Sequence, residues 1–128
     1  PTIGIGRVGL LAQATPLSRL ARKLKRATGA GCVAVVGDEQ VLHRAIVCVG
    51  AAGSLPFSLT PGPGDVVVTG ELRHHDALQI SRAGATAIAL SHWSSERPAL
   101  RSLGDRLANA CNIDTVLSGA DCEPFRRV

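Results

Sequence analysis

Histidine and carboxylate side chains cluster just after two apolar runs of the chain, residues 66–69 and 85–90. The side chains of these clusters are Glu71, His74, His75, Asp76, His92 and Glu96. Imidazole nitrogen and carboxylate oxygen suit zinc, manganese, iron or nickel better than calcium. His92 and Glu96 lie four residues apart, a spacing that places both on one face of a helix. The clusters therefore predict part of a divalent-metal site.

The same carboxylates also have a purely structural interpretation. Glu96 would stabilise the N-terminus of a helix through its dipole, with Ser94 as the cap. Asp76 would do the same for the preceding helix. A single His-x-x-x-Glu spacing is a weak signal, and two protein ligands are too few for a tight site. From the residues alone, both interpretations remain open.

Hydrophobic patterning predicts alternating strands and helices. Strands are expected at 2–12, 32–36, 41–49, 66–69, 85–90 and 113–117, and helices at 16–28, 72–83 and 95–110. Thr15 is the expected N-cap of the first helix and Pro16 its first residue. The short turn at 37–40 is compatible with a hairpin. From residue 65 onward, the β-α-β-α-β alternation predicts parallel strands with right-handed crossovers, and ligands beyond their carboxyl ends.

Two glycine-rich stretches each have two interpretations. Residues 4–9 match the G-x-G-x-x-G pattern of dinucleotide sites, but only three residues come before them, where such a site needs a strand. A bent or bulged edge strand explains these glycines better. Residues 50–55 follow a predicted strand end, where backbone N–H groups can approach an anion or a metal-bound ligand. A tight turn is the alternative there.

The composition narrows the class of protein. With 128 residues, 45% of them hydrophobic and 2% aromatic, the chain is expected to form a single α/β domain whose core is aliphatic. The net charge of +4 is compatible with an anionic ligand. Nucleic acid is not the favoured partner, because no basic block is interleaved with aromatic residues. The densest basic run, 19–26, is interpreted as the solvated face of a helix.

The spacing of the cysteines and the N-terminal residues are informative about the cellular compartment and about processing of the chain. Cys32, Cys48, Cys111 and Cys122 are too far apart for a C-x-x-C motif, and no secretory segment is recognisable. Buried free thiols in a reducing cytoplasm are the expected state. No apolar run is long enough to span a membrane. Because the sequence begins at Pro1 rather than Met, a fragment or processed chain is expected.

Several segments, in matching order, resemble one known family. The sequence TGELRHHDAL at 69–78 resembles the TGE-x-x-(H/Y)-HD segment of the dinuclear metal centre family, also known as GTP cyclohydrolase 1 type 2 or NIF-three-like proteins. The sequence SHWSSER at 91–97 resembles its GH-x-x-(S/T)ER segment. Residues 114–128 are similar to its closing strand and D-x-(D/N)P tail, and residues 4–7 and 47–54 also fit.

The resemblance implies a fold and a site. The chain would be the C-terminal half of an α/β protein with a mixed, largely parallel sheet flanked by helices. His92 and Glu96 would be ligands of a site for two divalent metal ions, with His75 as a catalytic group. Glu71, His74 and Asp76 would be further site residues. The missing N-terminal half would supply the other ligands, a His-His pair and an Asp, and the family implies a ring-like hexamer.

Three function classes follow. The first is a metal-dependent hydrolase resembling GTP cyclohydrolase 1 type 2, in which bound metal supplies a hydroxide near neutral pH. GTP itself is less well supported than hydrolysis, because the chain has no P-loop and no obvious triphosphate cradle. The second is a non-catalytic metal-binding regulatory or assembly protein. The third, less favoured, is a small nucleic-acid-binding domain, whose affinity would collapse as salt rises.

Overall fold

A computed structural model of the chain describes residues 4–126. It contains one five-stranded sheet in the order β1-β3-β4-β5-β2. The strands are β1 (Arg7–Pro16), β2 (Ala34–Val36), β3 (Val41–Ala51), β4 (Asp65–Glu71) and β5 (Thr86–Ala89). The helices are α1 (Leu17–Thr28), the 3-10 helix η1 (Leu55–Leu59), α2 (His74–Arg82) and α3 (His92–Cys111).

The three central strands are parallel. β4 pairs with β3 on one side and with β5 on the other, while β1 and β2 pair antiparallel with β3 and β5 as the two edges. The predicted mixed, largely parallel sheet flanked by helices is confirmed. Since β3, β4 and β5 run in the same direction, their carboxyl ends meet at one edge of the sheet, where ligands of such sheets bind.

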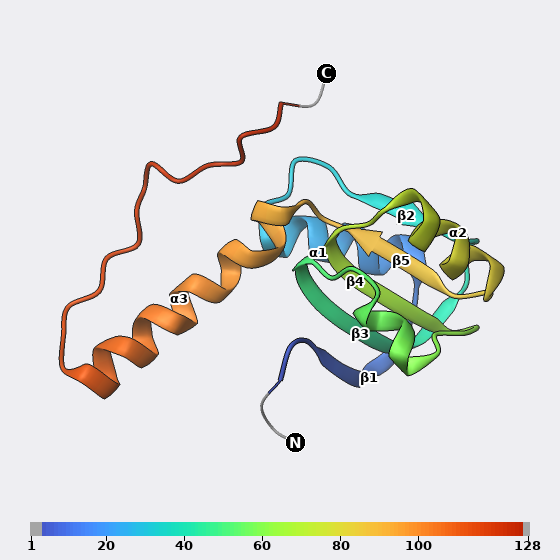
Figure 1. The fold of residues 1–128 in the computed structure, drawn as a ribbon, viewed down its shortest axis with the longest axis horizontal. Helices are drawn as coiled ribbons and strands as arrows, with labels where there is room; N and C mark the ends of the chain where they lie inside the picture. The colour runs from blue at the N-terminus through green and yellow to red at the C-terminus, as the bar shows by residue number, and fades with distance from the viewer. Residues whose placement is uncertain (1–3, 127–128) are drawn as a thin grey trace.

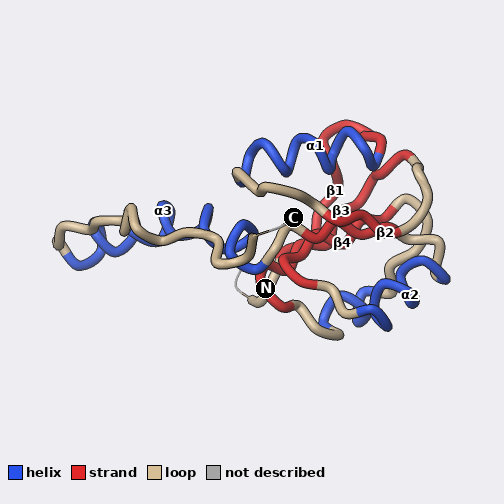
Figure 2. The backbone as a smooth tube through the Cα atoms, turned by 90° about the horizontal axis from the view of Figure 1, so that it is seen from above, coloured by secondary structure: helices blue, strands red, loops and turns tan. Residues whose placement is uncertain are grey.

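Helices cover both faces of the sheet. α1 lies over one face, and α2 and η1 lie over the other (Figure 2). Side chains alternate along a strand, so Val66 and Val68 of β4 pack under α1 while Val67 faces Ile80 of α2. Val66, Val67 and Ile80 are fully buried. This aliphatic core fixes the position of the carboxyl ends of the strands.

Helix α3 begins at the sheet and then extends away from it, and the segment after it runs back alongside (Figure 1). Arg97 holds this returning segment, because its guanidinium lies 2.9 Å from Asp121 Oδ2 and donates to the Ser118 carbonyl at 2.7 Å. Gly104 leaves room for Thr115 to pack closely against the helix. The far part of α3 leaves Leu100, Leu103 and Leu107 exposed.

Three predicted details of secondary structure are wrong. Thr15 and Pro16 end β1 instead of starting the helix, since they pair with Leu42 and Val41 of β3. No hairpin joins β2 to β3, because β2 pairs with β5 across the sheet. Residues 113–117 form no strand, since this segment runs beside α3, away from any sheet edge (Figure 1).

All four cysteines are free, as predicted, but their burial differs from the prediction. Cys48 is buried in the core, and this burial raises the pKa of its thiol. Cys32 is half-buried, and Cys111 and Cys122 are exposed. Among residues 4–126, no helix combines the length and apolar character needed to cross a membrane.

The Arg44–Asp65 ion pair joins β3 to the start of β4. The Arg44 guanidinium donates to Asp65 at 2.8 Å and the Gly62 amide donates to it at 2.9 Å. The hydrogen bond from Arg44 lowers the pKa of Asp65 below its usual value, against the opposing effect of burial. A carboxyl with a depressed folded-state pKa stabilises the fold above its unfolded pKa, about 3.9, and loses this contribution as the pH falls.

We therefore predict that Asp65→Asn destabilises the protein near neutral pH, and that its difference from the native chain shrinks toward about pH 3. Urea unfolding of both proteins across this range measures the effect. A difference that stays constant with pH would show that the charge of Asp65 contributes nothing.

Candidate metal site

Three of the six candidate side chains meet at the carboxyl edge of the sheet. His92 Nδ1 lies 3.2 Å from Glu71 Oε1, and His92 Nε2 lies 3.3 Å from Glu96 Oε2. All three side chains are about half exposed, so the cluster opens to solvent. The imidazole thus lies between two carboxylates, one from the end of β4 and one from its own helix.

The parallel pairing of β4 with β5 creates this arrangement. The Leu90 amide donates to the Thr69 carbonyl and the Ser91 amide to the Gly70 carbonyl, both at 3.0 Å, so the pairing continues past the end of β5. Glu71 and His92 therefore emerge side by side from neighbouring strand ends. The sequence-based expectation that these two ends share an edge is confirmed.

Ser95 ties a third strand end to the cluster. Its buried hydroxyl accepts the Gly50 N–H at 2.8 Å and donates to the His92 carbonyl at 2.9 Å. Gly50, at the end of β3, is thereby held against the first turn of α3. A Cβ on Gly50 would overlap Glu96 Oε1 and lie 3.2 Å from His92 Nε2. Gly50 has φ +65°, which also favours glycine.

Ser91, directly before the histidine, has a strained backbone. Its φ of 102° and ψ of 157° belong to a region that is essentially limited to glycine. The family segment quoted above has glycine at this position. The Ser91 hydroxyl caps α3 by accepting the Ser94 N–H at 3.2 Å, and it also hydrogen-bonds to Glu123. These bonds hold Ser91 in a conformation that sets the direction of His92.

The structure places the other three candidates on α2. His74 and His75 are exposed in the first turn, with ring centroids 6.1 Å apart. Among the described residues, no hydrogen bond or ion pair joins them to the Glu71–His92–Glu96 cluster. Asp76 is buried and forms a bidentate ion pair with Arg73. Arg73 Nε donates to Oδ2 at 2.7 Å and Nη2 donates to Oδ1 at 3.1 Å. Both oxygens of Asp76 are therefore already bonded to Arg73, the residue directly before α2.

The cluster fits the donor chemistry of a metal site. Metal-binding histidines usually give their other ring N–H to a carboxylate, and Glu71 is placed to accept from His92 Nδ1. Nε2 and Glu96 would then be the two ligands, in a cradle that a Cβ on Gly50 would fill. Within residues 4–126, no group of three His, Cys, Asp or Glu side chains is placed to hold one ion. Further ligands would have to come from elsewhere.

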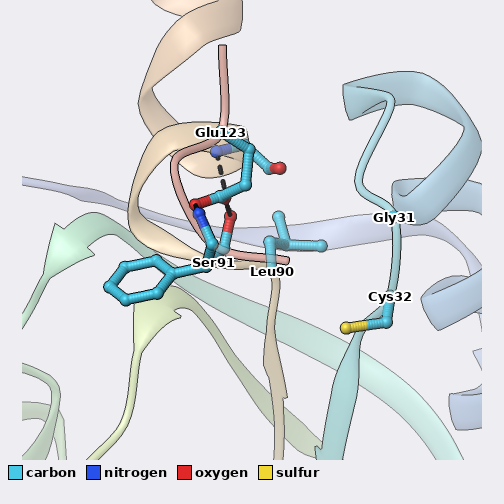
Figure 3. A pocket seen from close by; sticks show the side chains of 7 residues that line it. Gly31, Cys32, Leu90, Ser91 and Glu123 are labelled. Atoms are coloured by element: carbon cyan, nitrogen blue, oxygen red, sulfur yellow. Dashed lines mark hydrogen bonds between the residues drawn. The ribbon is translucent and has the colours of Figure 1, made fainter. Parts of the chain in front are cut away.

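Two cavities beside the start of α3 share the returning C-terminal segment as a wall, and one of them is lined by members of the cluster. One, of about 270 Å³, is lined by Gly70, Glu71, His92 and Phe125, among others. The second, of about 350 Å³, lies between Cys32 and Ser91 and is bounded by Glu123 (Figure 3). The Ser91–Glu123 hydrogen bond thus positions the segment next to the candidate ligands.

Sequence reasoning did not identify Ser91, Ser95 or Glu123 as parts of the site. Ser95 lies in the (S/T)ER segment of the family resemblance, which was a usable signal. Glu123 is 32 residues from Ser91, so only the fold reveals their contact. Gly50 was recognised only as part of a small-residue loop, and its approach to Glu96 depends on the pairing of β3 with β4.

Gly50 offers a test of this geometry. We predict that Gly50→Ala is slightly more destabilising than Gly53→Ala, as measured by thermal and urea unfolding. The excess is small because the overlapping atoms are the movable ends of half-exposed side chains. Both glycines have positive φ, which costs an alanine about 1–2 kcal/mol, but a Cβ on Gly53 meets nothing within 4 Å. The excess at Gly50 therefore measures the displacement of His92 and Glu96. Equal losses in the two variants would contradict the close packing at Gly50.

Known proteins resemble the chain over about three quarters of its length or more. It is 35% identical over 99 residues to the GTP cyclohydrolase 1 type 2 homolog of Mycobacterium tuberculosis, a match that covers 74% of the chain and 26% of that protein. It is 29% identical over 129 residues to human NIF3-like protein 1, covering 98% of the chain and 34% of that protein. The chain thus spans about a quarter to a third of the length of these curated relatives.

Solved structures show the same fold. The crystal structure of Staphylococcus aureus protein SA1388 superposes with a TM-score of 0.82 at 26% identity, covering 98% of the chain and 42% of that protein. Reduced HcgD from Methanocaldococcus jannaschii, at 20% identity, superposes with a TM-score of 0.68 and shares the fold. Residues 2–124 match the profile of the Duf34/NIF3 (NGG1p interacting factor 3) family. The chain therefore belongs to the Duf34/NIF3 family.

Proposed function

We propose that this chain supplies one wall of a metal site in a hydrolase. His92 Nε2 and Glu96 would bind the metal, and Glu71 would hold the imidazole through Nδ1. Bound divalent metal would lower the pKa of a water molecule and so supply a hydroxide nucleophile. The observation that carries this proposal is the placement of His92 between Glu71 and Glu96, with Gly50 leaving room beside Nε2.

The proposal also holds that the site is completed by residues outside this chain. An ion held by two ligands would have several open coordination positions. Zinc sites in proteins commonly use three or four protein ligands. Trp93, next to His92, has a buried Nε1–H that lacks a hydrogen-bond partner within residues 4–126. Buried donors usually have partners, so this N–H is an exception directly beside the candidate ligand. A second metal ion would likewise need residues outside this chain.

Other parts of the proposal depend on the family names rather than on geometry. The relatives named GTP cyclohydrolase 1 type 2 homolog suggest a nucleotide substrate. His75 would act as a general acid or base only if the complete site approaches the first turn of α2, where this side chain is exposed. The four free cysteines, two of them exposed, favour a reducing compartment such as the cytoplasm.

A non-catalytic assembly role is the second candidate. The observation that favours it is an apolar groove of about 320 Å³ between α3 and the returning segment, lined by Leu100, Leu103, Leu107 and Val116, among others. A second copy of the chain would bury these side chains and form the homo-oligomer implied by the resemblance. Light scattering of native and Leu103→Glu proteins tests this, since only an oligomer built on the groove would dissociate in the variant.

Turnover separates the two candidates. The chain covers only part of the length of its relatives. The assay is therefore done on the full-length protein that contains this chain, loaded with metal. Hydrolysis of nucleotides or phosphoesters that is lost in Glu96→Gln would support the hydrolase. Complete inactivity over a broad panel, with metal bound and the oligomer intact, would favour the assembly role.

Metal binding by the chain alone is predicted to be weak and centred on His92. In a titration of the ¹⁵N-labelled chain with Mn²⁺, we expect paramagnetic broadening to be strongest at the amides of Gly50, His92 and Glu96. Half-saturation should lie above the micromolar range, because two ligands are present. Sub-micromolar affinity would contradict the proposal that the site is incomplete.

Matched variants locate the binding. His92→Ala and Glu96→Gln should each abolish the broadening at Gly50, whereas a His74→Ala and His75→Ala double variant should leave it unchanged. All these side chains are exposed, so the substitutions are not expected to unfold the chain. Broadening centred on α2, or unaffected by His92→Ala, would remove the ligand assignment.

A further inference from the structure

The excess positive charge of the protein is concentrated on one helix. Of the fourteen basic residues, five belong to α1, and the nine others are outnumbered by the ten acidic residues. The five are Arg19, Arg22, Lys23, Lys25 and Arg26. Helix α1 contains no acidic residue. The net charge of +4 is therefore a property of this helix, while the rest of the chain is close to neutral.

The basic side chains lie on the outer face of α1. Helix α1 lies over one face of the sheet (Figure 2), and its residues Leu17, Leu20 and Ala21 are buried in the core beneath it. At 100° per residue, Arg19, Lys23 and Arg26 point away from this buried side, as does Arg22. All five cations are exposed. The helix of 12 residues is about 18 Å long, so the basic face forms a short, straight ridge.

These cations also lack partners within the described part of the chain. Arg44, Arg73 and Arg97 each form an ion pair with an aspartate, whereas none of the basic residues of α1 does. The nearby acid Glu39 accepts the Ser18 N–H at the start of the helix instead. Mixed charges are typical of a face that only needs solvation, whereas an unpaired face of one sign is electrostatically suited to an anionic partner.

The amino-acid composition of the basic face of α1 distinguishes between classes of anionic partner. No large hydrophobic side chain of α1 is exposed, and a helix that lies in a membrane surface needs an apolar face to insert. Protein interfaces likewise have an apolar core. α1 also has no aromatic residue on which unpaired bases could stack, as single-stranded nucleic acid requires. The phosphate backbone of a duplex needs only cations.

We propose that the basic face of α1 binds the phosphate backbone of duplex nucleic acid without sequence specificity. This proposal replaces the sequence-based interpretation of residues 19–26 as a face that is merely solvated. The sequence-based expectation against nucleic acid depends on the scarcity of aromatic residues, which disfavours single-strand binding and does not bear on the duplex backbone. α1 covers one face of the sheet, whereas the Glu71–His92–Glu96 cluster lies at its carboxyl edge, so the proposal is independent of the metal site.

The test is the salt dependence of binding to a short fluorescent DNA duplex of random sequence, followed by anisotropy. Affinity is expected to be weak at physiological salt, roughly micromolar or weaker, and to fall as salt rises. The slope of log affinity against log salt should be about −0.9 for each phosphate contacted. Arg22→Gln with Arg26→Gln should reduce that slope by about 2, and glutamine preserves the helix because its propensity is similar.

The matched control is Arg82→Gln with Arg106→Gln, which removes the same charge from exposed positions outside α1. This variant should bind with the native slope. Equal losses in both variants would show that only net charge matters and would overturn the proposal. Salt-independent binding, or equal or tighter binding to single-stranded DNA, inorganic polyphosphate or acidic vesicles, would overturn it as well. Circular dichroism confirms that each variant is folded.

Discussion

The hydrogen bond between the Gly50 amide and the Ser95 hydroxyl is the contact on which the candidate site depends. It joins the end of β3 to the first turn of α3, while the Ser91 amide joins that turn to the end of β4. Three strand ends are thereby fixed around one imidazole. Because the Ser95 hydroxyl is buried and makes both of its bonds, its loss would leave the Gly50 N–H unsatisfied, at a cost of about 1–3 kcal/mol.

Much of this architecture follows from local sequence signals. The valines of β4 and the apolar run of β5 predict buried parallel strands, and their shared edge correctly brings Glu71 next to His92. Local sequence signals fail where contacts between residues far apart in the chain determine which strands pair. Residues 34–36 join the far edge of the sheet rather than the strand that follows them, and residues 113–117 find no strand partner within the described chain. The hydrophobic periodicity of the sequence predicts neither outcome.

The same division applies to the site. Residue type and spacing point to His92 and Glu96, but they also include His74, His75 and Asp76 among the candidates, and the fold separates these three from the cluster. Asp76 shows why: its carboxylate is already bonded to Arg73, so the residue type alone overstated its availability. Ser91 and Gly50 are distinguished by their positive φ and by close approach, which become visible only when the backbone is known.

The most direct test of the central claim is a crystal structure of the chain grown with a high concentration of zinc, with anomalous diffraction collected at the zinc edge. The account predicts an anomalous peak about 2.0–2.2 Å from His92 Nε2 and from a Glu96 oxygen, with Glu71 still bonded to Nδ1. A peak on His74 or His75, with none beside His92, would contradict it.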